Sequence, residues 1–426
     1  MNPLLQPLPY HLRLRDFLKG NHREVWDWFS SAEAESDYSD AVQLELLKST
    51  YRLDRAAHEA IYAVVDEVKD KLGLLVPVTL YQMQDAGGPG QAALYFTPGH
   101  GHVVFGGKIL DLLDADERRA LVGHELAHFK LWTEEGGEFL VADRILLAMA
   151  GDGRAEPSHH ESARLYRLFT EIYADRGSVF VTGSPESAIG ALIKTVTGTS
   201  DIAPASYLAQ ADEVVERSGQ DLKSSGFTHP EEFLRAKSIT LWASAHAEEA
   251  ETGSLGETEA EIERMIIGRC SLDSLDLTQQ ERLSELTRET MRHLLEPAWI
   301  RTGRTLAHAK LYFSDFDPGE PRLCDSMQVV AEKFGACDEK TRHYLAHILL
   351  DFSVADRDLE ENGLAAGVRA ADALGVSVEF DAGARKELKV LKRDLTAIRK
   401  NLDERFKRAG EEHAALSKRE QREFFD

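Results

Sequence analysis

Leu121-Val-Gly-His-Glu-Leu-Ala-His-Phe129 is the stretch that decides the fold of this chain and its candidate chemistry. It contains an H-E-x-x-H pattern, with His124 and His128 four residues apart. On a helix such residues project from one face, so both imidazoles can bind one Zn²⁺. Glu125 then lies beside the open coordination position, where it can take a proton from zinc-bound water and pass it to a leaving amine. The pattern therefore predicts a catalytic zinc site.

The surroundings of this stretch fit that interpretation. A helix is predicted from about Asp116 to Thr133, with an acidic residue available to cap it. Before it comes the only β-rich part of the sequence, where three short segments predict strands at Leu75–Met83, Ala92–Phe96 and His102–Phe105. The alternative is chance, because a chain of this length and composition shows the pattern about once in twenty.

A catalytic zinc site needs a third protein ligand, and the best candidate lies in Thr170-Glu-Ile-Tyr-Ala-Asp-Arg176. Glu171 and Asp175 are four residues apart in a helix predicted over about Ser158–Val181. Glu171 can ligate the metal, and Asp175 can accept the free N–H of a ligating histidine. Taken alone, the two carboxylates also fit an ordinary solvated acidic face.

The HELAH segment followed by EIYAD resembles the zinc peptidases of the HtpX and CAAX prenyl protease family. The resemblance covers about residues 40 to 240. It implies a zincin-like domain of the gluzincin type with one Zn²⁺ per chain, held by His124, His128 and Glu171. It further implies Glu125 as general base and acid, and Asp175 as the residue that orients a histidine.

Two further segments carry the same resemblance. Val103–Leu113 looks like the strand and lead-in to the active helix, and Thr228-His229-Pro230 with Arg235 looks like the family's H-P segment with a following Arg. His229 is then expected to bind substrate or stabilise the oxyanion, and Arg235 to brace the site electrostatically. For His229 the alternative is a helix-start His-Pro without a role in the site. The chain departs from the family where Gln91-Ala92 replaces an Asn-Ala pair in the edge strand, and in its lack of a predicted membrane span.

Composition limits the class of protein. The chain has 426 residues and a net charge of −23, so it is long enough for two or three domains and too acidic for a nucleic-acid binder. Its three cysteines lie far apart, which favours a reducing compartment. We find no secretory signal and no stretch of about 18 apolar residues, so the sequence predicts a soluble, cytoplasmic protein without a transmembrane segment.

These signals predict an α+β, predominantly helical protein. We expect an N-terminal extension over 1–38, a zinc peptidase domain with a small sheet over 39–265, and an all-α domain over 266–426. The boundary is placed near seven glutamates between Glu248 and Glu263, interpreted as a solvated linker or an exposed helix face. The chain should end in a long, highly charged helix. Residues 347–375 weakly resemble the TerB-like helical fold, which implies metal sensing or protein interaction, with a solvated helix–loop–helix as the alternative.

Other histidines are weaker candidates. His343 and His347 have helical spacing but lack the glutamate that would serve as base. His100 and His102 flank a turn and could line the cleft, although a turn role is favoured. His159-His160 precede the second helix, where a loop role is favoured.

The favoured hypothesis is a zinc-dependent metalloendopeptidase that hydrolyses peptide bonds in protein or peptide substrates with a zinc-activated water and Glu125 as base. The alternative is a non-proteolytic zinc-binding scaffold or stress-response sensor that binds protein partners through its helical C-terminal domain. A third possibility is a peptidase inhibited by its own C-terminal half.

Overall fold

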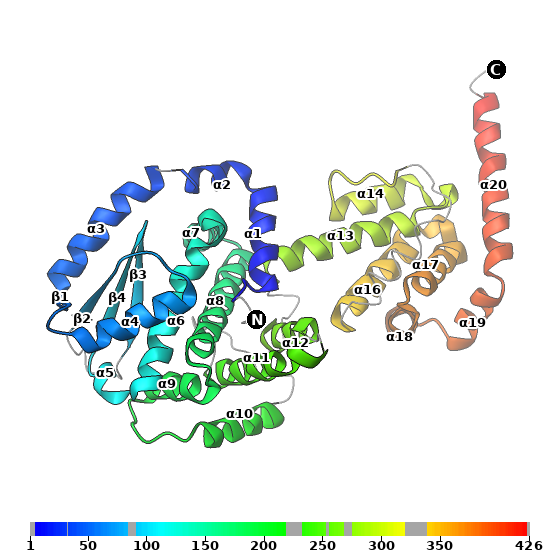
Figure 1. Ribbon diagram of the computed structural model, residues 1–426. Coiled ribbons are helices and arrows are strands. Elements are labelled where there is room, and N and C mark those ends of the chain that lie inside the picture. Colours follow the sequence, from blue (N-terminus) through cyan, green and yellow to red (C-terminus); the bar gives the residue numbers. More distant parts are fainter. Residues whose placement is uncertain are drawn as a thin grey trace. The chain divides into compact units, whose positions relative to one another are not determined.

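Helices account for most of the chain, and one small sheet lies among them in the N-terminal half (Figure 1). This computed structural model describes residues 5–31, 33–83, 91–218, 232–252, 255–267, 275–319 and 339–423. The chain forms two units, Met1–Thr278 and Gln279–Asp426. The predicted α+β, predominantly helical class is confirmed.

The sheet has four strands in the order β1-β2-β4-β3. Strands β2 and β4 are parallel, whereas the β1–β2 and β3–β4 pairs are antiparallel. Three of the strands were predicted within a few residues, and β1 was not. The strand bounds are β1 (Thr50–Arg52), β2 (Val78–Met83), β3 (Ala92–Thr97) and β4 (His100–Gly106).

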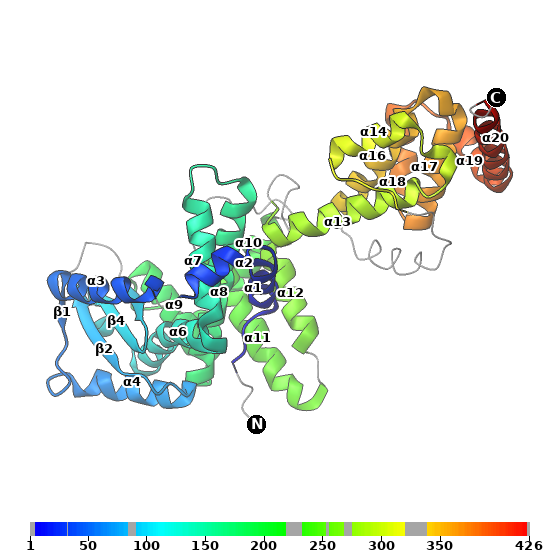
Figure 2. The ribbon, with the colours of Figure 1, turned by 90° about the horizontal axis from the view of Figure 1, so that it is seen from above.

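Both faces of the sheet are covered by helices, because apolar residues occupy both sides of β2 and β4. Leu80 and Val103 belong to the large core that includes buried residues of α4 (Glu59–Leu72) and α6 (Ala115–Thr133). Tyr81 and Val104 face the other way and pack with Leu46 of α3 (Glu33–Ser49). Seen from above, α3, the sheet and α4 form successive layers (Figure 2).

Helix α6 carries the H-E-x-x-H pattern and has a complete N-terminal cap. The Asp114 side chain accepts hydrogen bonds from the backbone N–H groups of Asp116 and Glu117, and the Glu117 carboxylate accepts one from the Asp114 N–H. This capping box fixes where the helix begins. The predicted span, Asp116–Thr133, differs from the observed helix by one residue at its start.

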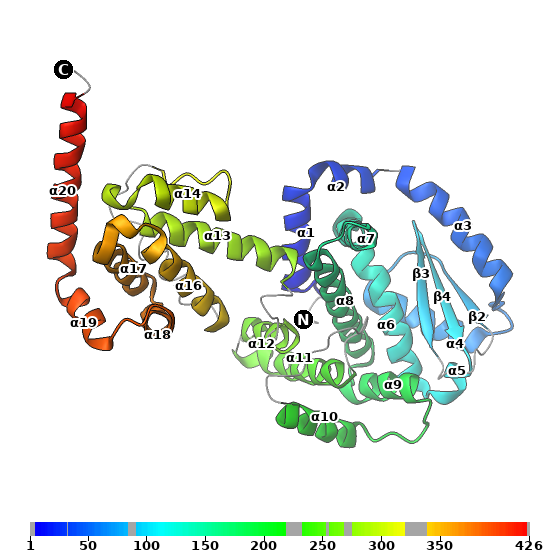
Figure 3. The ribbon, with the colours of Figure 1, turned by 180° about the vertical axis from the view of Figure 1, so that it is seen from behind.

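Helix α8 (Pro157–Thr182) crosses α6 at close range, and both are visible from behind (Figure 3). The contact is made by Gly123 and Gly177, where a Cβ on either residue would lie 2.4 Å or less from an atom of the other helix. The predicted second helix, Ser158–Val181, is confirmed within one residue at each end.

The other helices of the N-terminal unit surround this pair. The apolar α7 lies between α6 and α8 in the chain and follows a short 3-10 turn, η1. Their bounds are α1 (Pro9–Asn21), α2 (Arg23–Phe29), α5 (Ile109–Leu112), η1 (Glu134–Gly137), α7 (Glu138–Gly151), α9 (Pro185–Thr197), α10 (Pro204–Ser218), α11 (Glu232–Thr252) and α12 (Leu255–Ile267).

The acidic run is more than a solvated linker or face. Glu259 on α12 forms a bidentate ion pair with Arg176, whose side chain is 4% exposed, at 2.7 and 2.9 Å. Ile262 on the same helix is fully buried in the large core. Helix α12 therefore packs within the N-terminal unit, and part of the predicted linker is structural.

The described part of the second unit has only helices and short 3-10 turns as regular structure. Its own apolar core includes Leu349, Phe352 and Phe380. The charged C-terminal helix that the sequence predicts is α20. The bounds are α13 (Leu277–Leu294), η3 (Ala298–Ile300), α14 (Gly303–Tyr312), α16 (Glu339–Ala355), η4 (Arg357–Leu359), α17 (Glu360–Leu374), α18 (Ser377–Glu387), α19 (Lys392–Lys400) and α20 (Leu402–Glu423).

Among the helices described here, none combines the length and the apolar character needed to span a bilayer.

Candidate metal centre

His124 and His128 lie on successive turns of α6 and on the same side of the helix. Their Nε2 atoms are 3.3 Å apart, and their rings meet edge to face with centroids 4.9 Å apart. Both side chains are largely buried, at 13% and 10% exposure. The helix alone therefore supplies two converging nitrogen donors, as its four-residue spacing predicts.

The third donor comes from α8. The Glu171 carboxylate places Oε2 3.5 Å from His124 Nε2 and Oε1 3.6 Å from His128 Nε2. Ligands bound to one Zn²⁺ at about 2.1 Å in a tetrahedron are about 3.4 Å from each other. The three observed separations match that value, so these residues fit a single zinc ion. Among the described residues, this is the one group of His, Cys, Asp and Glu side chains whose donor atoms could share a metal.

Behind the donors lies a buried ion-pair network. Asp175 Oδ1 is 3.1 Å from His124 Nδ1, and Arg235 on α11 donates to both oxygens of Asp175 at 2.8 and 2.6 Å. The guanidinium also lies 3.2 Å from Glu171 Oε2. One cation thus faces two largely buried carboxylates, so once His124 is neutral the network carries one net negative charge beside the metal position, which favours a divalent cation there.

The pKa values of the ligands follow from this network. Burial opposes protonation of His124, but hydrogen bonds to Asp175 and Glu171 outweigh it and raise its pKa to about 10. Burial lowers the pKa of His128 to about 4, which keeps that ring neutral. Since a ligating imidazole must be unprotonated, a zinc ion bound here would have to displace a proton from His124.

Glu125 has the environment of a general base. Its side chain is buried, and burial raises its pKa to about 7, opposed by the nearby His124. It also accepts a hydrogen bond from the backbone of Leu94 on β3. A pKa near the working pH suits a group that must both accept and return a proton.

Strand β3 lies at the edge of the sheet beside this carboxylate. The Gly106 N–H donates to the Gln91 carbonyl. In an antiparallel ladder every second residue pair is hydrogen-bonded, so the next bonded pairs between β3 and β4 are Ala93–Val104 and Tyr95–His102. The N–H and C=O groups of Leu94 therefore face the outer edge. In the described part of the chain no strand pairs with that edge.

Some of the predicted site residues meet at this centre and others do not. His124, Glu125, His128, Glu171, Asp175 and Arg235 all meet at this centre, although their roles stay predictions. His229 lies outside the described residues. His100 and His102 do not line the site, because they stack on each other on the sheet face opposite α6, with centroids 4.4 Å apart.

The weaker histidine candidates have local partners elsewhere. His343 and His347 lie on α16, near Glu339 at 3.8 Å and Glu387 at 3.5 Å. His159 is in the first turn of α8 rather than in a loop, and its Nδ1 accepts the Glu156 N–H.

Sequence reasoning missed Trp132. It follows His128 by four residues on α6, and its indole stacks on the His128 ring with centroids 5.6 Å apart and planes 28° apart. The signal was present, because positions 124, 128 and 132 repeat every four residues and share one helix face.

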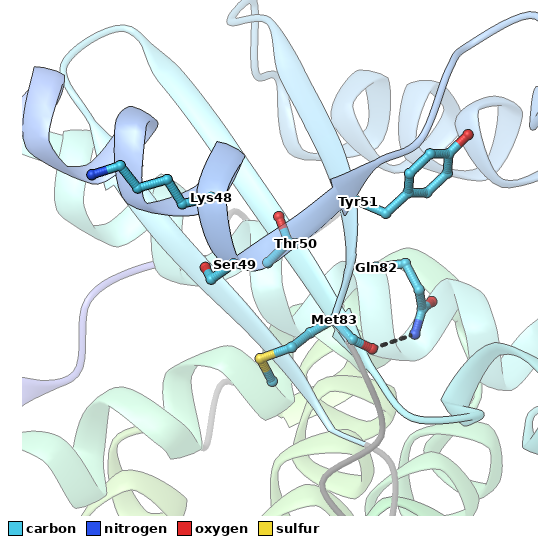
Figure 4. Close-up of a pocket in the computed structure, with 6 residues that line it drawn as sticks. All are labelled: Lys48, Ser49, Thr50, Tyr51, Gln82 and Met83. Atoms are coloured by element: carbon cyan, nitrogen blue, oxygen red, sulfur yellow. Dashed lines mark hydrogen bonds between the residues drawn. The ribbon is translucent and has the colours of Figure 1, made fainter.

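A pocket elsewhere is not part of this centre. It lies where α3 passes into β1 and beside the end of β2, and none of the candidate residues lines it (Figure 4). The Gln82 amide, which is part of its lining, donates to the Met83 carbonyl at 3.0 Å. The lining residues are Lys48, Ser49, Thr50, Tyr51, Gln82 and Met83.

Comparison with known proteins gives one relevant similarity. The chain is 27% identical over 176 residues to a protein described as a "Protease HtpX homolog" from Methanothermobacter thermautotrophicus, across 37% of this chain and 67% of that protein. No family model matches the chain. No solved structure matches it.

Proposed function

We propose that this protein is a zinc-dependent metalloendopeptidase that cleaves peptide bonds in protein substrates, with one Zn²⁺ held by His124, His128 and Glu171. The observation that carries this proposal is the meeting of three donor atoms at tetrahedral separations, with the buried Glu125 carboxylate on the same helix. The similarity to a protein described as a protease supports the same reaction class.

Each group has a defined task in this reaction. When bound, Zn²⁺ supplies a Lewis acid that polarises the scissile carbonyl and lowers the pKa of the attacking water to about 7. Glu125 accepts a proton from that water and gives it to the leaving amine. Asp175 holds the His124 ring by its Nδ1 atom, and Arg235 keeps Asp175 and Glu171 ionised by lowering their pKa values against the effect of burial.

The substrate would bind as an added strand along the outer edge of β3. There the Leu94 N–H donates to Glu125 and its carbonyl faces the same edge, so a peptide paired with this edge would pass the candidate base. Backbone pairing binds extended segments of many sequences, which suits an endopeptidase acting on unfolded regions.

The test combines metal content with turnover of an unfolded protein such as casein. The wild-type protein should contain one zinc per chain and cleave casein. Glu125→Gln should keep the zinc, lose turnover by at least about 10²-fold, and hold uncleaved substrates. Glu59→Gln, at an exposed position on α4, serves as the matched control and should leave both properties unchanged.

Two results would contradict the proposal. One is purified protein without zinc, and the other is casein turnover that Glu125→Gln does not reduce. Zinc retained without turnover on diverse unfolded substrates would instead support the scaffold or sensor alternative, with the helical C-terminal unit as the binding part.

A further inference from the structure

The two imidazoles of the metal centre are held in different ways. His124 has a hydrogen-bonding partner for its outer nitrogen, since Nδ1 lies 3.1 Å from Asp175. The Nδ1 atom of His128 is buried and has no hydrogen-bond partner among the described residues. A ligating histidine ordinarily donates its other N–H to a neighbouring acceptor, which fixes the ring.

His128 is supported by an aromatic contact on the face of its ring. Trp132 lies one turn beyond His128, and the two rings are nearly parallel, with centroids 5.6 Å apart and an angle of 28°. Phe96 of β3 contacts the Trp132 ring edge-on, with ring centroids 6.0 Å apart and an angle of 84° between the planes. Phe96 is in turn packed at 5.0 Å from Phe129 of α6. The indole is therefore itself fixed between α6 and the edge strand.

The orientation of the His128 ring decides whether it can bind a metal. Rotation about the Cβ–Cγ bond of histidine has a broad, weakly preferred minimum. Such a rotation would move Nε2 away from Glu171, 3.6 Å distant, and from His124, 3.3 Å distant. A flat indole against the imidazole face opposes that rotation, because a turned ring would lose the stacked contact.

We propose that Trp132 is a positioning residue that holds His128 in its metal-binding orientation by ring stacking, as Asp175 holds His124 by a hydrogen bond. This inference rests on the zinc site of the proposed function. It predicts that metal affinity depends on an aromatic ring at position 132, whereas the folding of the rest of the protein does not depend on that ring.

The experiment measures zinc affinity of the full-length protein by competition with a chromogenic chelator, and the visible spectrum of the cobalt-substituted protein. Trp132→Leu should weaken zinc binding roughly tenfold, as loss of a supporting contact does, and should change the Co²⁺ absorption bands. Trp132→Phe keeps a ring and should restore most of the affinity. Trp28→Phe, at a 60% exposed tryptophan of α2, is the matched control and should match the wild type.

Phe96→Leu provides a second route, because it removes the ring that supports Trp132 without altering α6. It should weaken zinc binding by a smaller factor than Trp132→Leu. If Trp132→Leu does not fold, Phe96→Leu carries the test alone, with circular dichroism confirming its fold.

Folded variants that bind zinc as tightly as the wild type and give the wild-type cobalt spectrum would overturn this inference. So would a Trp132→Phe variant as weak as Trp132→Leu. Failure of the proposed function looks different, because the wild-type protein itself would then bind no zinc.

Discussion

At the scale of single residues, the centre depends on Asp175, which is 3% exposed and accepts hydrogen bonds from Arg235 and His124. Its charge offsets the buried guanidinium, and its oxygen orients an imidazole. A neutral side chain of the same shape would keep the packing, lose the charge and keep only one oxygen to accept the bonds of Arg235 and His124. It would leave Arg235 with Glu171 as its remaining nearby anion in the network.

We therefore expect Asp175→Asn to lower zinc affinity by roughly 10- to 100-fold, the usual cost of losing such a partner. Chelator competition measures this directly. Asp212→Asn is the control, because it alters an ion pair with Lys237 in which Asp212 is 64% exposed, and it should have little effect. Equal zinc affinity of Asp175→Asn and the wild type would show that Asp175 does not position His124.

A buried histidine outside the metal centre contributes to the stability of the fold. His11 on α1 is fully buried, accepts the Leu8 N–H at Nδ1, and lies 3.3 Å from the Thr170 hydroxyl through Nε2. Burial, assisted by the positive charge of Arg176, lowers its pKa from 6.5 to about 3. The folded protein therefore holds this ring neutral, whereas the unfolded chain takes up a proton near pH 6.5.

The sign of the pH effect follows. The stability that depends on neutral His11 is fully present above pH 6.5 and is lost as the pH falls towards 3. Between about pH 6 and 4 the loss is roughly 1.4 kcal/mol per pH unit. In urea titrations His11→Asn should be less stable than the wild type at pH 7, with a shallower loss on acidification. His343→Asn, at a 48% exposed side chain, should keep the wild-type slope, and equal slopes for all three proteins would refute the assignment.

The candidate metal ligands and the candidate base were predictable from the sequence, whereas the residues that support them were not. His124, Glu125 and His128 follow from residue type and helical spacing, and the paired acids of EIYAD follow from the need for a third ligand. Trp132 shares the helix face of His124 and His128, but an aromatic residue at that position also fits an ordinary core, as does the lone histidine at position 11. Their contacts with β3 and α8 arise only when the chain is folded.

At the scale of elements, the centre exists because α6 and α8 approach closely enough for Glu171 to reach both histidines. The approach needs glycine. A Cβ on Gly177 would lie 2.3 Å from the Ala127 Cβ and 3.0 Å from the Gly123 carbonyl oxygen, and neither the backbone nor a short side chain can yield. Any larger residue has to push the helices apart.

Gly177→Ala should accordingly destabilise the protein by about 1–3 kcal/mol, the cost of overpacking, and weaken zinc binding as Glu171 withdraws. Urea unfolding and chelator competition measure the two effects. Gly20→Ala on α1 is the matched control, because nothing lies within 4 Å of its added Cβ. It should be neutral or stabilising by about 0.5–1 kcal/mol. A Gly177→Ala protein as stable as the wild type would mean that the helices can separate without cost.

Secondary structure was predictable where a pattern is local. The ends of α6 and α8 followed from caps and periodicity, and β2, β3 and β4 from runs of β-branched and aromatic residues between turns. Strand β1 was missed because Thr50–Arg52 has only three residues, too few for an alternating pattern, and depends on pairing with β2. It lies between α3 and α4 in the chain.

At the scale of the whole molecule, each of the two units has its own apolar core. The predicted boundary near residue 265 and the observed division after Thr278 differ in where they assign the segment between them. Within it, Ile266 and Leu277 are buried in the first core. Tyr10 donates to Asp276, and the Leu277 N–H donates to Ser162 at 2.8 Å. These contacts attach the segment to the N-terminal unit.

The fragment 1–278 should therefore fold on its own and bind one zinc, because it holds the complete first core and every described residue of the metal centre. The fragment 1–265 should be less stable by roughly 3–5 kcal/mol, since it loses two buried aliphatic side chains and the bonds to Ser162 and Tyr10. Urea unfolding of the two fragments measures the difference, and equal stability would favour the boundary near 265.

The longer fragment also tests inhibition by the C-terminal half, with zinc content as the control for an intact centre. Unchanged casein turnover would reject inhibition and leave recruitment or sensing as the role of the helical unit. A rise would support inhibition, because removing unit 2 leaves the proposed catalytic residues and their core in place. We expect turnover of 1–278 to be retained, since the proposed ligands, base and edge strand all belong to unit 1. Complete loss of turnover with zinc retained would show instead that residues beyond Thr278 take part in catalysis or substrate binding.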